Sequence, residues 1–341
     1  MTQRVLLVGN PTAQSGKNAE RIAVARKAMD ARGLHHELLH TAPAGATVGQ
    51  VSAALQADRS LGMVVAMGGD GTFAEVAKGL LGSGRAGEVV LGMLPTGTAN
   101  DQGKSFGLSS APEAIEANVA VLAGSGEQAL DAGRLLLEDE AGQMLKEELF
   151  FDSAGWGLSP AVLKLRNEDR ETVSQVPLLR ELYRDHLVYA GALLRTWAVG
   201  YAVDTKFDVD GTLDDVPFHL EGLTDLVVKA TRVYGGMWVF DPTSRPDDGL
   251  FELVPFVGRR DWVSKVMVHL DASGNLEKSL GDVGVHHSPV RRAASFKLRF
   301  HAHQAPIYGQ IDGEELTASP RVRIDVLPRA LRLRVPSPDG T

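Results

Sequence analysis

Short apolar runs alternate with helical patterns over roughly the first third of the chain. The runs predict strands over residues 4–9, 34–41, 62–67 and 89–94. The segments between them repeat apolar residues at the helical period, which predicts helices over residues 17–32, 48–57, 73–81 and 112–123. Strands without polar alternation are typical of a parallel sheet covered by helices on both faces. We therefore expect an N-terminal α/β domain with a parallel sheet.

The pattern changes after residue 130. Apolar and polar residues then alternate with a period of two, and turn dipeptides recur at Asp210-Gly211, Asp248-Gly249 and Asp312-Gly313. These features predict an all-β antiparallel domain, interrupted by one helical stretch over residues 159–199. Residues 124–129, Gly-Ser-Gly-Glu-Gln-Ala, have the composition of a linker between the two parts.

Composition narrows the class of protein. The 341 residues suit two domains, and the net charge of −8 argues against a nucleic-acid binder, because such proteins usually carry a basic stripe. The absence of cysteine excludes disulfides, thiol nucleophiles and cysteine-bound zinc. The sequence has no signal-peptide pattern and no apolar stretch of about 18 uncharged residues. We expect a cytoplasmic protein without a transmembrane segment.

The C-terminal end of the chain is basic. Residues 291–334 hold nine Lys or Arg and four Asp or Glu, a net charge of +5, so the rest of the chain carries −13. Exposed strand faces account for such a segment, and so does a face that meets anionic lipid or phosphate. The sequence leaves both interpretations open.

Residues 36–40, His-Glu-Leu-Leu-His, match the spacing of zinc peptidases. That chemistry needs a helix, but the segment lies between Gly33 and the turn at residues 41–43, which leaves room only for a strand. Residues i and i+4 of a strand are about 13 Å apart, too far to share one zinc ion. The segment is therefore predicted to be a polar strand.

Two further motifs lack the context that their chemistry needs. Residues 103–107 read GxSxG, but the preceding strand ends near Leu94, so Ser105 would not lie on the sharp strand-to-helix turn of a serine hydrolase. Residues 82–87 read GxGxxG, but they follow a helix and precede a strand, the reverse of the dinucleotide-binding order. The second segment is predicted to be a loop.

The strongest chemical signal is a glycine loop between a strand and a helix. Residues 68–72, Gly-Gly-Asp-Gly-Thr, would let backbone N–H groups approach an oligophosphate at a helix N-terminus. Residues 95–101, Pro-Thr-Gly-Thr-Ala-Asn-Asp, follow the next strand, and residues 10–17 follow the first. All three loops should meet at the carboxyl edge of the sheet, where open α/β folds bind ligands.

Together, the segments NPTAQSGK (10–17), GGDGTFAEVAKGL (68–80) and PTGTANDQGKSFGL (95–108) resemble the diacylglycerol kinase catalytic-domain family of lipid kinases, which includes sphingosine and ceramide kinases. The bacterial soluble branch is the nearest match, and NAD kinase shares only the GGDGT loop. Residues 151–157, 246–250 and 310–314 fit as well, so the resemblance covers nearly the whole chain.

The resemblance implies a nucleotide-binding domain over residues 1–127 and about 328–338, and a β-sandwich lipid-substrate domain over residues 128–327. A final strand over residues 331–335 would return to the first domain. ATP would be contacted by Asn10, Lys17, Gly68, Gly69, Gly71, Thr72, Glu75, Thr96, Gly97, Thr98 and Asn100.

The resemblance also implies the catalytic groups. Asp70, Asp101 and Glu314 would serve Mg²⁺, and Asp312 would be the general base for the lipid hydroxyl. The spacing of Asp312 and Glu314 has its own logic, since residues i and i+2 of a strand share a face and could meet one ion. An exposed hairpin Asp-Gly is the alternative interpretation.

The resemblance implies one further metal site, and the sequence departs from the family pattern at one place. A structural metal would be held by the Asp248 side chain and the backbone oxygens of Arg245 and Leu250. The arginine that the family usually carries after its Asn-Asp pair is absent, and Gln102-Gly103-Lys104 stands there instead. The role of Gln102 stays open, and Lys104 is a candidate for the missing cation.

These features predict ATP- and Mg²⁺-dependent phosphoryl transfer to the hydroxyl of a lipid at a membrane surface. Diacylglycerol, ceramide and sphingoid acceptors stay open, because the apolar stripe over residues 178–194 is typical of ordinary core as well as of a lipid lining. The alternatives are an NAD kinase-like enzyme for a small molecule and an inactive nucleotide or lipid sensor. Peripheral membrane association and a homodimer are compatible with the sequence.

Overall fold

The computed structural model describes residues 4–11, 17–97, 99–157, 160, 206–235, 239–258, 261, 265, 288–303 and 307–337. Apart from residue 160, the predicted helical stretch over residues 159–199 lies outside these residues, and so does its apolar stripe. No helix in the described ranges is long and apolar enough to cross a membrane.

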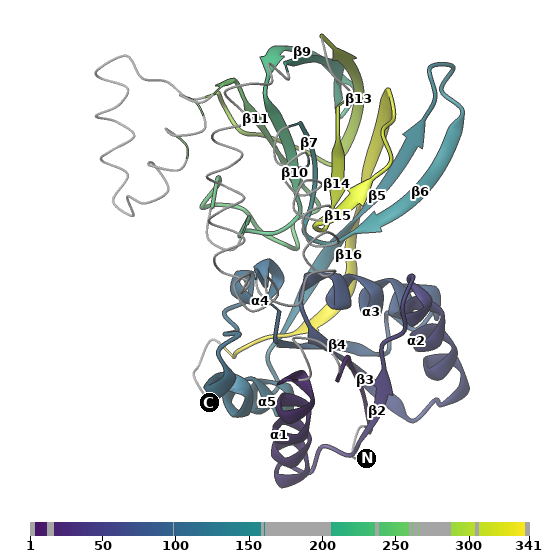
Figure 1. Cartoon of the computed structure of the whole chain (residues 1–341), viewed down its shortest axis with the longest axis vertical. Coiled ribbons are helices and arrows are strands. Elements are labelled where there is room, and N and C mark those ends of the chain that lie inside the picture. The colour runs from purple at the N-terminus through teal and green to yellow at the C-terminus, as the bar shows by residue number, and fades with distance from the viewer. Residues whose placement is uncertain are drawn as a thin grey trace, which may run out of the picture.

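The N-terminal part is a parallel sheet between two layers of helices (Figure 1). Its strands are β1 (Arg4–Gly9), β2 (His36–His40), β3 (Leu61–Gly68) and β4 (Val90–Pro95), in the order β2-β1-β3-β4. Its helices are α1 (Lys17–Ala31), α2 (Ala46–Ala57), α3 (Asp70–Gly82), α4 (Asp101–Ser105) and α5 (Ile115–Ala123), the last preceded by a 3₁₀ turn (Pro112–Ala114). The predicted α/β domain is confirmed.

The absence of polar alternation in these strands has the expected cause. On β1, Leu6 and Val8 pack with α2 and α3 in one apolar cluster, whereas Val5 and Leu7 pack with α1 and α5 in another. Both faces of each central strand are therefore buried, and neither face can hold polar residues.

The C-terminal part is a sandwich of two mainly antiparallel layers. One layer is built from β5 (Glu127–Glu138), β6 (Met144–Phe150), β8 (Phe207–Leu213), β9 (Val216–Leu223), β13 (Ser295–Ala302) and β16 (Arg321–Arg334). The other is built from β7 (Ser153–Gly157), β10 (Asp225–Lys229), β11 (Phe251–Phe256), β12 (Arg291–Ala293), β14 (Gly309–Ile311) and β15 (Glu314–Leu316).

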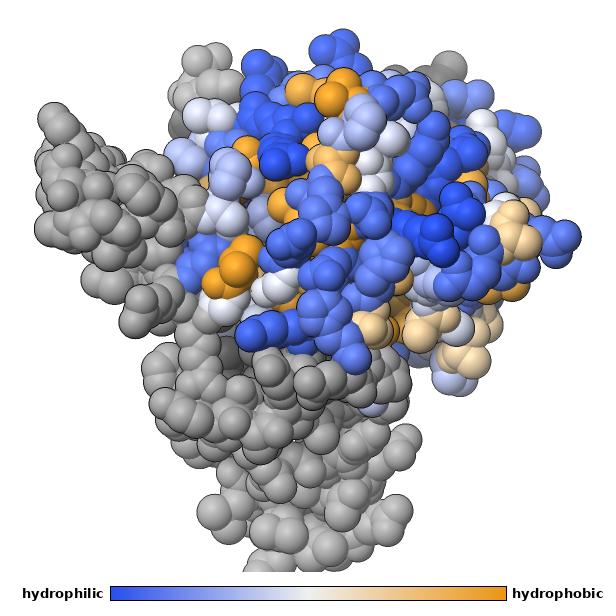
Figure 2. Space-filling model, turned by 90° about the horizontal axis from the view of Figure 1, so that it is seen from above, coloured by the Kyte–Doolittle hydropathy of each residue, from blue (hydrophilic) through white to orange (hydrophobic). Residues whose placement is uncertain are grey.

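Aromatic side chains join the two layers of the sandwich. The ring centroids of Phe150 and Phe251 are 5.4 Å apart, and those of Trp156 and Phe300 are 5.1 Å apart. Each pair takes one ring from each sheet, so the core lies between the sheets. The predicted sandwich is confirmed. Seen from above, its described surface is mostly hydrophilic, with apolar residues scattered between (Figure 2).

One ten-stranded sheet runs through both parts of the protein (Figure 1). The first half of β16 pairs with β13, and near its end Leu333 pairs with Leu91 of β4 in parallel. This confirms the predicted return of the chain to the first domain, as the end of a longer strand. The boundary near residue 127 stays a prediction.

The linker prediction was wrong for residues 127–129. The strand β5 begins at Glu127, and Ala129 already pairs with Arg332 of β16. Only residues 124–126 separate α5 from β5. Linker-like composition was overridden because the distant strand β16 supplies a hydrogen-bonding partner.

The turn predictions had mixed outcomes. Asp210-Gly211 lies inside β8, and the chain reverses instead at Asp214 and Asp215, whose φ angles are 48° and 64°. A Cβ at Gly211 would collide with the carbonyl oxygen of Lys297, so this glycine permits close strand approach. The turns at residues 248–249 and 312–313 are confirmed, since Gly249 and Gly313 have positive φ.

The three misleading motifs are also placed. Residues 36–40 form β2, as predicted, and both ring nitrogens of His36 are engaged, one 3.1 Å from Arg26 Nε and the other 3.0 Å from the Leu34 carbonyl oxygen. Gly82 is the last residue of α3, and residues 83–87 lie in the connection from α3 to β4, as predicted. As predicted, Ser105 does not lie on a strand-to-helix turn; it ends the short helix α4, and its hydroxyl accepts a hydrogen bond from Val233 N–H at 3.0 Å.

Candidate active site

Two of the predicted loops lie against each other at the carboxyl edge of the parallel sheet. The Gly68 carbonyl oxygen accepts hydrogen bonds from Thr96 N–H at 2.8 Å and Gly97 N–H at 3.3 Å. A Cβ at Gly97 would lie 2.5 Å from the Gly69 Cα, and a Cβ at Gly68 would collide with Thr72. Glycine is required here because the two backbones touch.

The Asp70 carboxylate connects the two loops through a hydrogen bond. Asp70 is the first residue of α3, which starts three residues earlier than predicted, and its Oδ1 accepts a hydrogen bond from Gln102 N–H of α4 at 3.1 Å. Burial raises the pKa of Asp70, and the nearby negative charge of Asp152 raises it further, while the amides of Gln102 and Asp101 oppose this. The carboxylate thus lies where the first turns of α3 and α4 meet.

For other residues predicted to contact the nucleotide, the structure shows hydrogen bonds within the protein. The Asn100 side chain donates to the Gly97 carbonyl oxygen at 2.6 Å and accepts from Gly97 N–H at 3.0 Å, which folds the second loop on itself. The Thr96 carbonyl oxygen accepts from Arg21 at 3.1 Å. Thr98 lies outside the described residues. Nucleotide contacts by these residues and by Glu75 stay predictions.

The first predicted loop is described only at its ends. The Asn10 carbonyl oxygen accepts a hydrogen bond from the buried Asn18 side chain at 2.6 Å, which ties the end of β1 to the first turn of α1. Lys17 begins α1, but residues 12–16 and the Lys17 side chain are not described. Contact of Lys17 with phosphate therefore stays a prediction.

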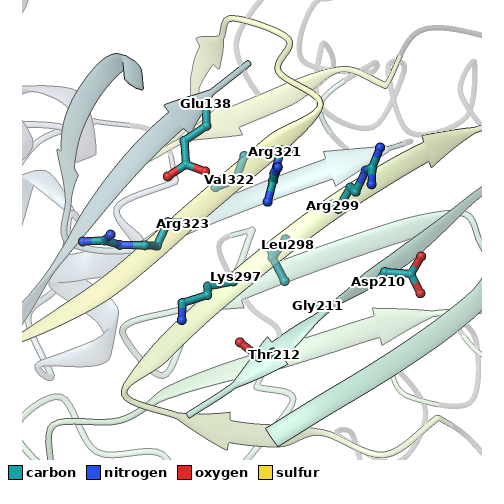
Figure 3. Close-up of a pocket in the computed structure, with 10 residues that line it drawn as sticks. All are labelled: Glu138, Asp210, Gly211, Thr212, Lys297, Leu298, Arg299, Arg321, Val322 and Arg323. Carbon is teal, nitrogen blue, oxygen red and sulfur yellow. The ribbon is translucent and has the colours of Figure 1, made fainter. Parts of the chain in front are cut away.

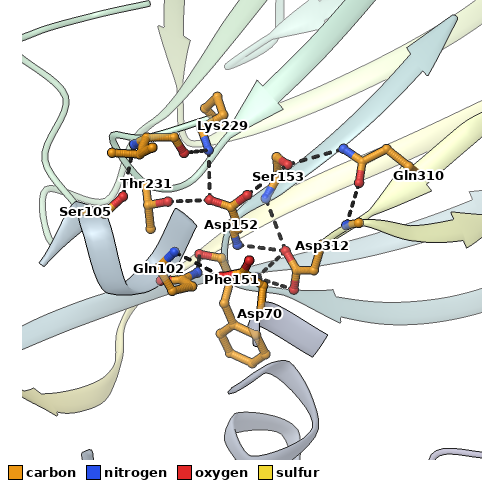
Figure 4. Close-up of polar contacts among 12 residues, drawn as sticks. Asp70, Gln102, Ser105, Phe151, Asp152, Ser153, Lys229, Thr231, Gln310 and Asp312 are labelled. Atoms are coloured by element: carbon orange, nitrogen blue, oxygen red, sulfur yellow. Dashed lines mark hydrogen bonds and ion pairs between the residues drawn. The ribbon is translucent and has the colours of Figure 1, made fainter. Parts of the chain in front are cut away.

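Asp312 lies in a nest of backbone amides (Figure 4). Its Oδ1 accepts from Asp152 N–H at 2.8 Å and Ser153 N–H at 3.1 Å, and its Oδ2 accepts from Phe151 N–H at 3.0 Å. The hairpin that carries it is braced by Gln310, whose Oε1 accepts from Gly313 N–H at 2.8 Å. The nest fixes the carboxylate, and Oδ2 keeps more free lone-pair capacity than Oδ1.

The environment of Asp312 suits a base. Burial raises the pKa of Asp312 to about 7, and the negative charge of Asp152 contributes, while the three amides pull the pKa down. A carboxyl group with a pKa near neutrality can be ionised at working pH and still take up a proton.

A buried ion pair that the sequence analysis missed supports the nest. Asp152 accepts from Lys229 Nζ at 2.8 Å and from the Thr231 hydroxyl at 2.6 Å (Figure 4). Lys229 also donates to the Val233 carbonyl oxygen at 2.6 Å. Both charged side chains are almost fully buried, at 8% and 4% exposure. The available sequence signal was a lone charge beside apolar residues, in Phe150-Phe151-Asp152 and Val227-Val228-Lys229.

Gln102 has a clear structural role. Its Nε2 donates to the Phe151 carbonyl oxygen at 2.6 Å, so α4 is tied to the peptide whose amide holds Asp312. Phe151 also packs edge-on against Phe73 of α3, with ring centroids 6.2 Å apart. Lys104 is exposed on α4, and its role as a substitute cation stays a prediction.

Glu314 reaches the glycine loop from the second sheet. A Cβ at Gly71 would lie 3.5 Å from Glu314 Oε1. The sequence analysis predicted that Asp312 and Glu314 share one face of a strand, and this was wrong. Asp312 lies in the turn, and Glu314 begins β15, where it pairs with Ile311. The hairpin turn, not a shared strand face, brings both carboxylates to this end of the sandwich.

The chemistry of these carboxylates fits Mg²⁺, which prefers oxygen ligands. Asp70 is partly buried and its pKa is raised, so a cation beside it would relieve an unfavourable charge. Within the described ranges, no three acidic or histidine side chains converge closely enough to hold a metal ion by themselves. Ligation by Asp70, Asp101 and Glu314 therefore stays a prediction.

The predicted structural metal site is a turn held by hydrogen bonds. Asp248 Oδ1 accepts from Leu250 N–H at 3.1 Å. The buried carboxylate of Asp131, which the sequence analysis missed, accepts from Gly249 N–H at 2.7 Å and from Arg329 N–H at 2.6 Å. Burial raises the pKa of Asp131. Ligation by Asp248 and by the carbonyl oxygens of Arg245 and Leu250 stays a prediction.

Comparison with known proteins assigns the first part of this chain to a family. Residues 4–135 match the family model described as diacylglycerol kinase catalytic domain. This part of the chain belongs to that kinase family. The protein therefore carries a phosphotransferase domain of a nucleotide-using class, and the two facing loops lie inside it.

Solved structures extend the likeness to the whole fold. A structure described as a diacylglycerol kinase from Bacillus anthracis str. Sterne has a TM-score of 0.67 at 18% identity, with 99% of each chain covered. A second structure from the same strain has a TM-score of 0.66 at the same identity and coverage. At this identity the likeness shows the fold alone.

Other comparisons add little to the kinase assignment. A yeast NADH kinase complexed with NADH has a TM-score of 0.47 at 10% identity, covering 97% of this chain and 82% of its own, and is too distant to carry an argument. No curated protein matches the chain.

Proposed function

We propose that this protein transfers the γ-phosphoryl group of ATP to the hydroxyl of a lipid, with Mg²⁺ as the cofactor. The observation that carries the proposal is the meeting of Asp312, a buried carboxylate of the C-terminal sandwich, with the glycine loops of the kinase-family domain. Gln102 and Phe151 connect the two parts directly. An acceptor domain is thus joined to a phosphate-binding domain at the place where a base is needed.

In this mechanism the glycine loops hold the phosphates. Backbone N–H groups at the first turn of α3 face the oligophosphate without Cβ obstruction, and the helix dipole favours its negative charge. Mg²⁺, when bound by Asp70, Asp101 and Glu314, would neutralise charge on the transferred group. Positioning and charge neutralisation supply most of the rate in phosphoryl transfer.

Asp312 handles the proton of the acceptor. Its Oδ2 takes one amide hydrogen bond at 3.0 Å and one acceptor position is left for the hydroxyl proton. The amide nest keeps the carboxylate from turning away as the hydroxyl oxygen attacks the γ-phosphorus. The acceptor would enter from a membrane surface, since a lipid hydroxyl lies there.

The deciding experiment offers the purified protein labelled ATP, Mg²⁺ and a panel of acceptors. Diacylglycerol, ceramide, sphingosine and NAD are each presented alone, the lipids in mixed micelles. Label in any lipid supports the proposal and identifies the acceptor. Label only in NAD makes this a small-molecule kinase, and nucleotide binding without transfer to any acceptor makes it a sensor.

Asp70→Asn should abolish transfer to the acceptor that the panel identifies, because the variant loses the charge that faces Mg²⁺ and the phosphates. Radiolabel transfer measures the effect. The fold should persist, since asparagine keeps the acceptor for Gln102 N–H. The matched control is Asp30→Asn, an exposed aspartate of α1, which should retain full activity. Undiminished turnover in Asp70→Asn would remove the glycine loop from the mechanism.

A further inference from the structure

The outer face of the ten-stranded sheet carries an open pocket of about 380 Å³. Four of its lining residues are cations, Lys297 and Arg299 of β13 and Arg321 and Arg323 of β16 (Figure 3). They alternate along their strands with residues that face the sandwich core, such as Leu298 and Val322, so the pocket opens away from the core.

The four cations form two cross-strand pairs that lie next to each other, and we call this group the cation square. Arg299 pairs with Arg321 across the two strands, and Lys297 pairs with Arg323 one step along. Like charges at directly opposite positions of an antiparallel pair are destabilising. The arrangement therefore costs stability in the free protein, and an anion lying between the four groups would remove that cost.

Each member of the cation square has a partner, and the acids differ in exposure. Arg323 donates to Asp325 Oδ2 from Nε at 3.1 Å and from Nη2 at 3.0 Å, and Asp325, which also pairs with Arg134, is 23% exposed. Lys297 pairs with Asp215 at 2.8 Å, and Arg299 pairs with Glu140 at 3.2 Å, but these acids are 83% and 68% exposed. Exposed pairs contribute little and exchange readily. The Arg321 side chain donates to the Glu140 carbonyl oxygen at 3.3 Å.

Each cross-strand pair of cations extends onto the neighbouring strands as a row of residues, and the two rows differ in their acidic residues. The row of Arg299 and Arg321 ends in Asp210 on one side and Glu138 on the other. Asp210 is engaged by two imidazoles, with His219 at 2.6 Å and His301 at 2.9 Å. The row of Lys297 and Arg323 continues into Thr212 on one side and Leu136 on the other and has no acid in line. Acids nevertheless border both rows, since Arg323 pairs with Asp325 and Lys297 pairs with Asp215.

We propose that this pocket binds an anion of the phosphomonoester or phosphodiester class. The guanidinium groups of Arg299 and Arg321 offer paired N–H donors that match phosphate oxygens, and the Lys297 ammonium group and the Thr212 hydroxyl complete the donor set. The pocket is separate from the candidate active site, because Asp312 belongs to the hairpin of the other sheet. The inference does not depend on the proposed transfer reaction.

The ligand chemistry has two sources, a phospholipid headgroup or a free phosphate compound, and the test separates them. Calorimetric titration of the full chain with glycerol 3-phosphate measures the free source. Co-sedimentation with phosphatidylcholine vesicles, with and without phosphatidic acid, measures the membrane source. Binding in both arms shows that the pocket takes the phosphate itself, and binding only to phosphatidic acid vesicles shows that it takes the headgroup.

The variant Arg299→Gln/Arg321→Gln should weaken the observed binding by about tenfold or more, since it removes two charge-assisted donors. Its unfolding temperature should not fall, because the substitution also removes a like-charge pair. The control Arg59→Gln/Arg245→Gln removes two exposed arginines outside the pocket and equalises net charge. Wild-type protein that binds neither probe would overturn the proposal. Equal loss in both double variants would do the same, by showing non-specific attraction.

Discussion

Asp312→Asn should lower phosphoryl transfer by about 100-fold or more, the usual scale for loss of general-base catalysis, while the affinity for ATP changes little. Asparagine keeps the size of the side chain and one acceptor for the amides of residues 151–153, but it cannot take up the hydroxyl proton. Steady-state transfer and direct nucleotide titration measure the two quantities.

The pH profile provides a control for this variant. Burial and the charge of Asp152 raise the pKa of Asp312 to about 7, so the wild-type rate should fall as the pH drops below about 7 and the base becomes protonated. The residual activity of Asp312→Asn should lack this fall, and Glu315→Gln in the same hairpin should keep it. Near-normal turnover in Asp312→Asn would remove this residue from the mechanism. An equal loss of ATP binding would instead make Asp312 a magnesium ligand.

Lys229→Met should lower the free energy of unfolding by roughly 3–5 kcal/mol, the usual cost of removing one partner of a buried ion pair. Asp152 is buried beside Lys229, so its charge would be left uncompensated, and the Val233 carbonyl oxygen would lose its donor. Urea denaturation of the two proteins at neutral pH measures the difference.

A double variant separates charge from packing at this position. Asp152→Asn/Lys229→Met leaves no buried charge at these two positions, so it should be more stable than Lys229→Met alone. Lys78→Met breaks the ion pair of Lys78 with Glu148, which is about one quarter exposed, and should cost far less. If Lys229→Met cost no more than Lys78→Met, the ion pair would not support the amide nest.

Local sequence determined the elements of the first domain. Apolar runs without alternation predicted β1, β3 and β4, and the predicted helices correspond to α1, α2, α3 and α5, because burial of both strand faces leaves a direct mark on residue type. The short segment between Gly33 and Thr41 left room only for a strand, so β2 was predicted correctly although its residues match the spacing of zinc peptidases. Glycine marked the two facing loops because the backbones there come too close for a Cβ.

The candidate site was partly visible in the sequence. Asp70, Asp312 and Glu314 were found through motif and resemblance, and the structure brings them to one end of the sandwich. The reason given for the pair Asp312 and Glu314 was wrong, because Asp312 lies in the turn and only Glu314 lies on a strand. Spacing in sequence identified the residues without identifying their geometry.

Tertiary structure alone decided what surrounds these residues. The sequence determined which segments are strands and where glycine is needed, because those choices depend on local burial and backbone approach. Pairing with β16 turned residues 127–129 from linker into strand, and pairing with β13 placed Asp210 inside β8. The partnership of Asp152 with Lys229 joins residues far apart in the chain. Such contacts leave no local pattern in the sequence, because the partner of each residue lies on a strand that is distant in the chain.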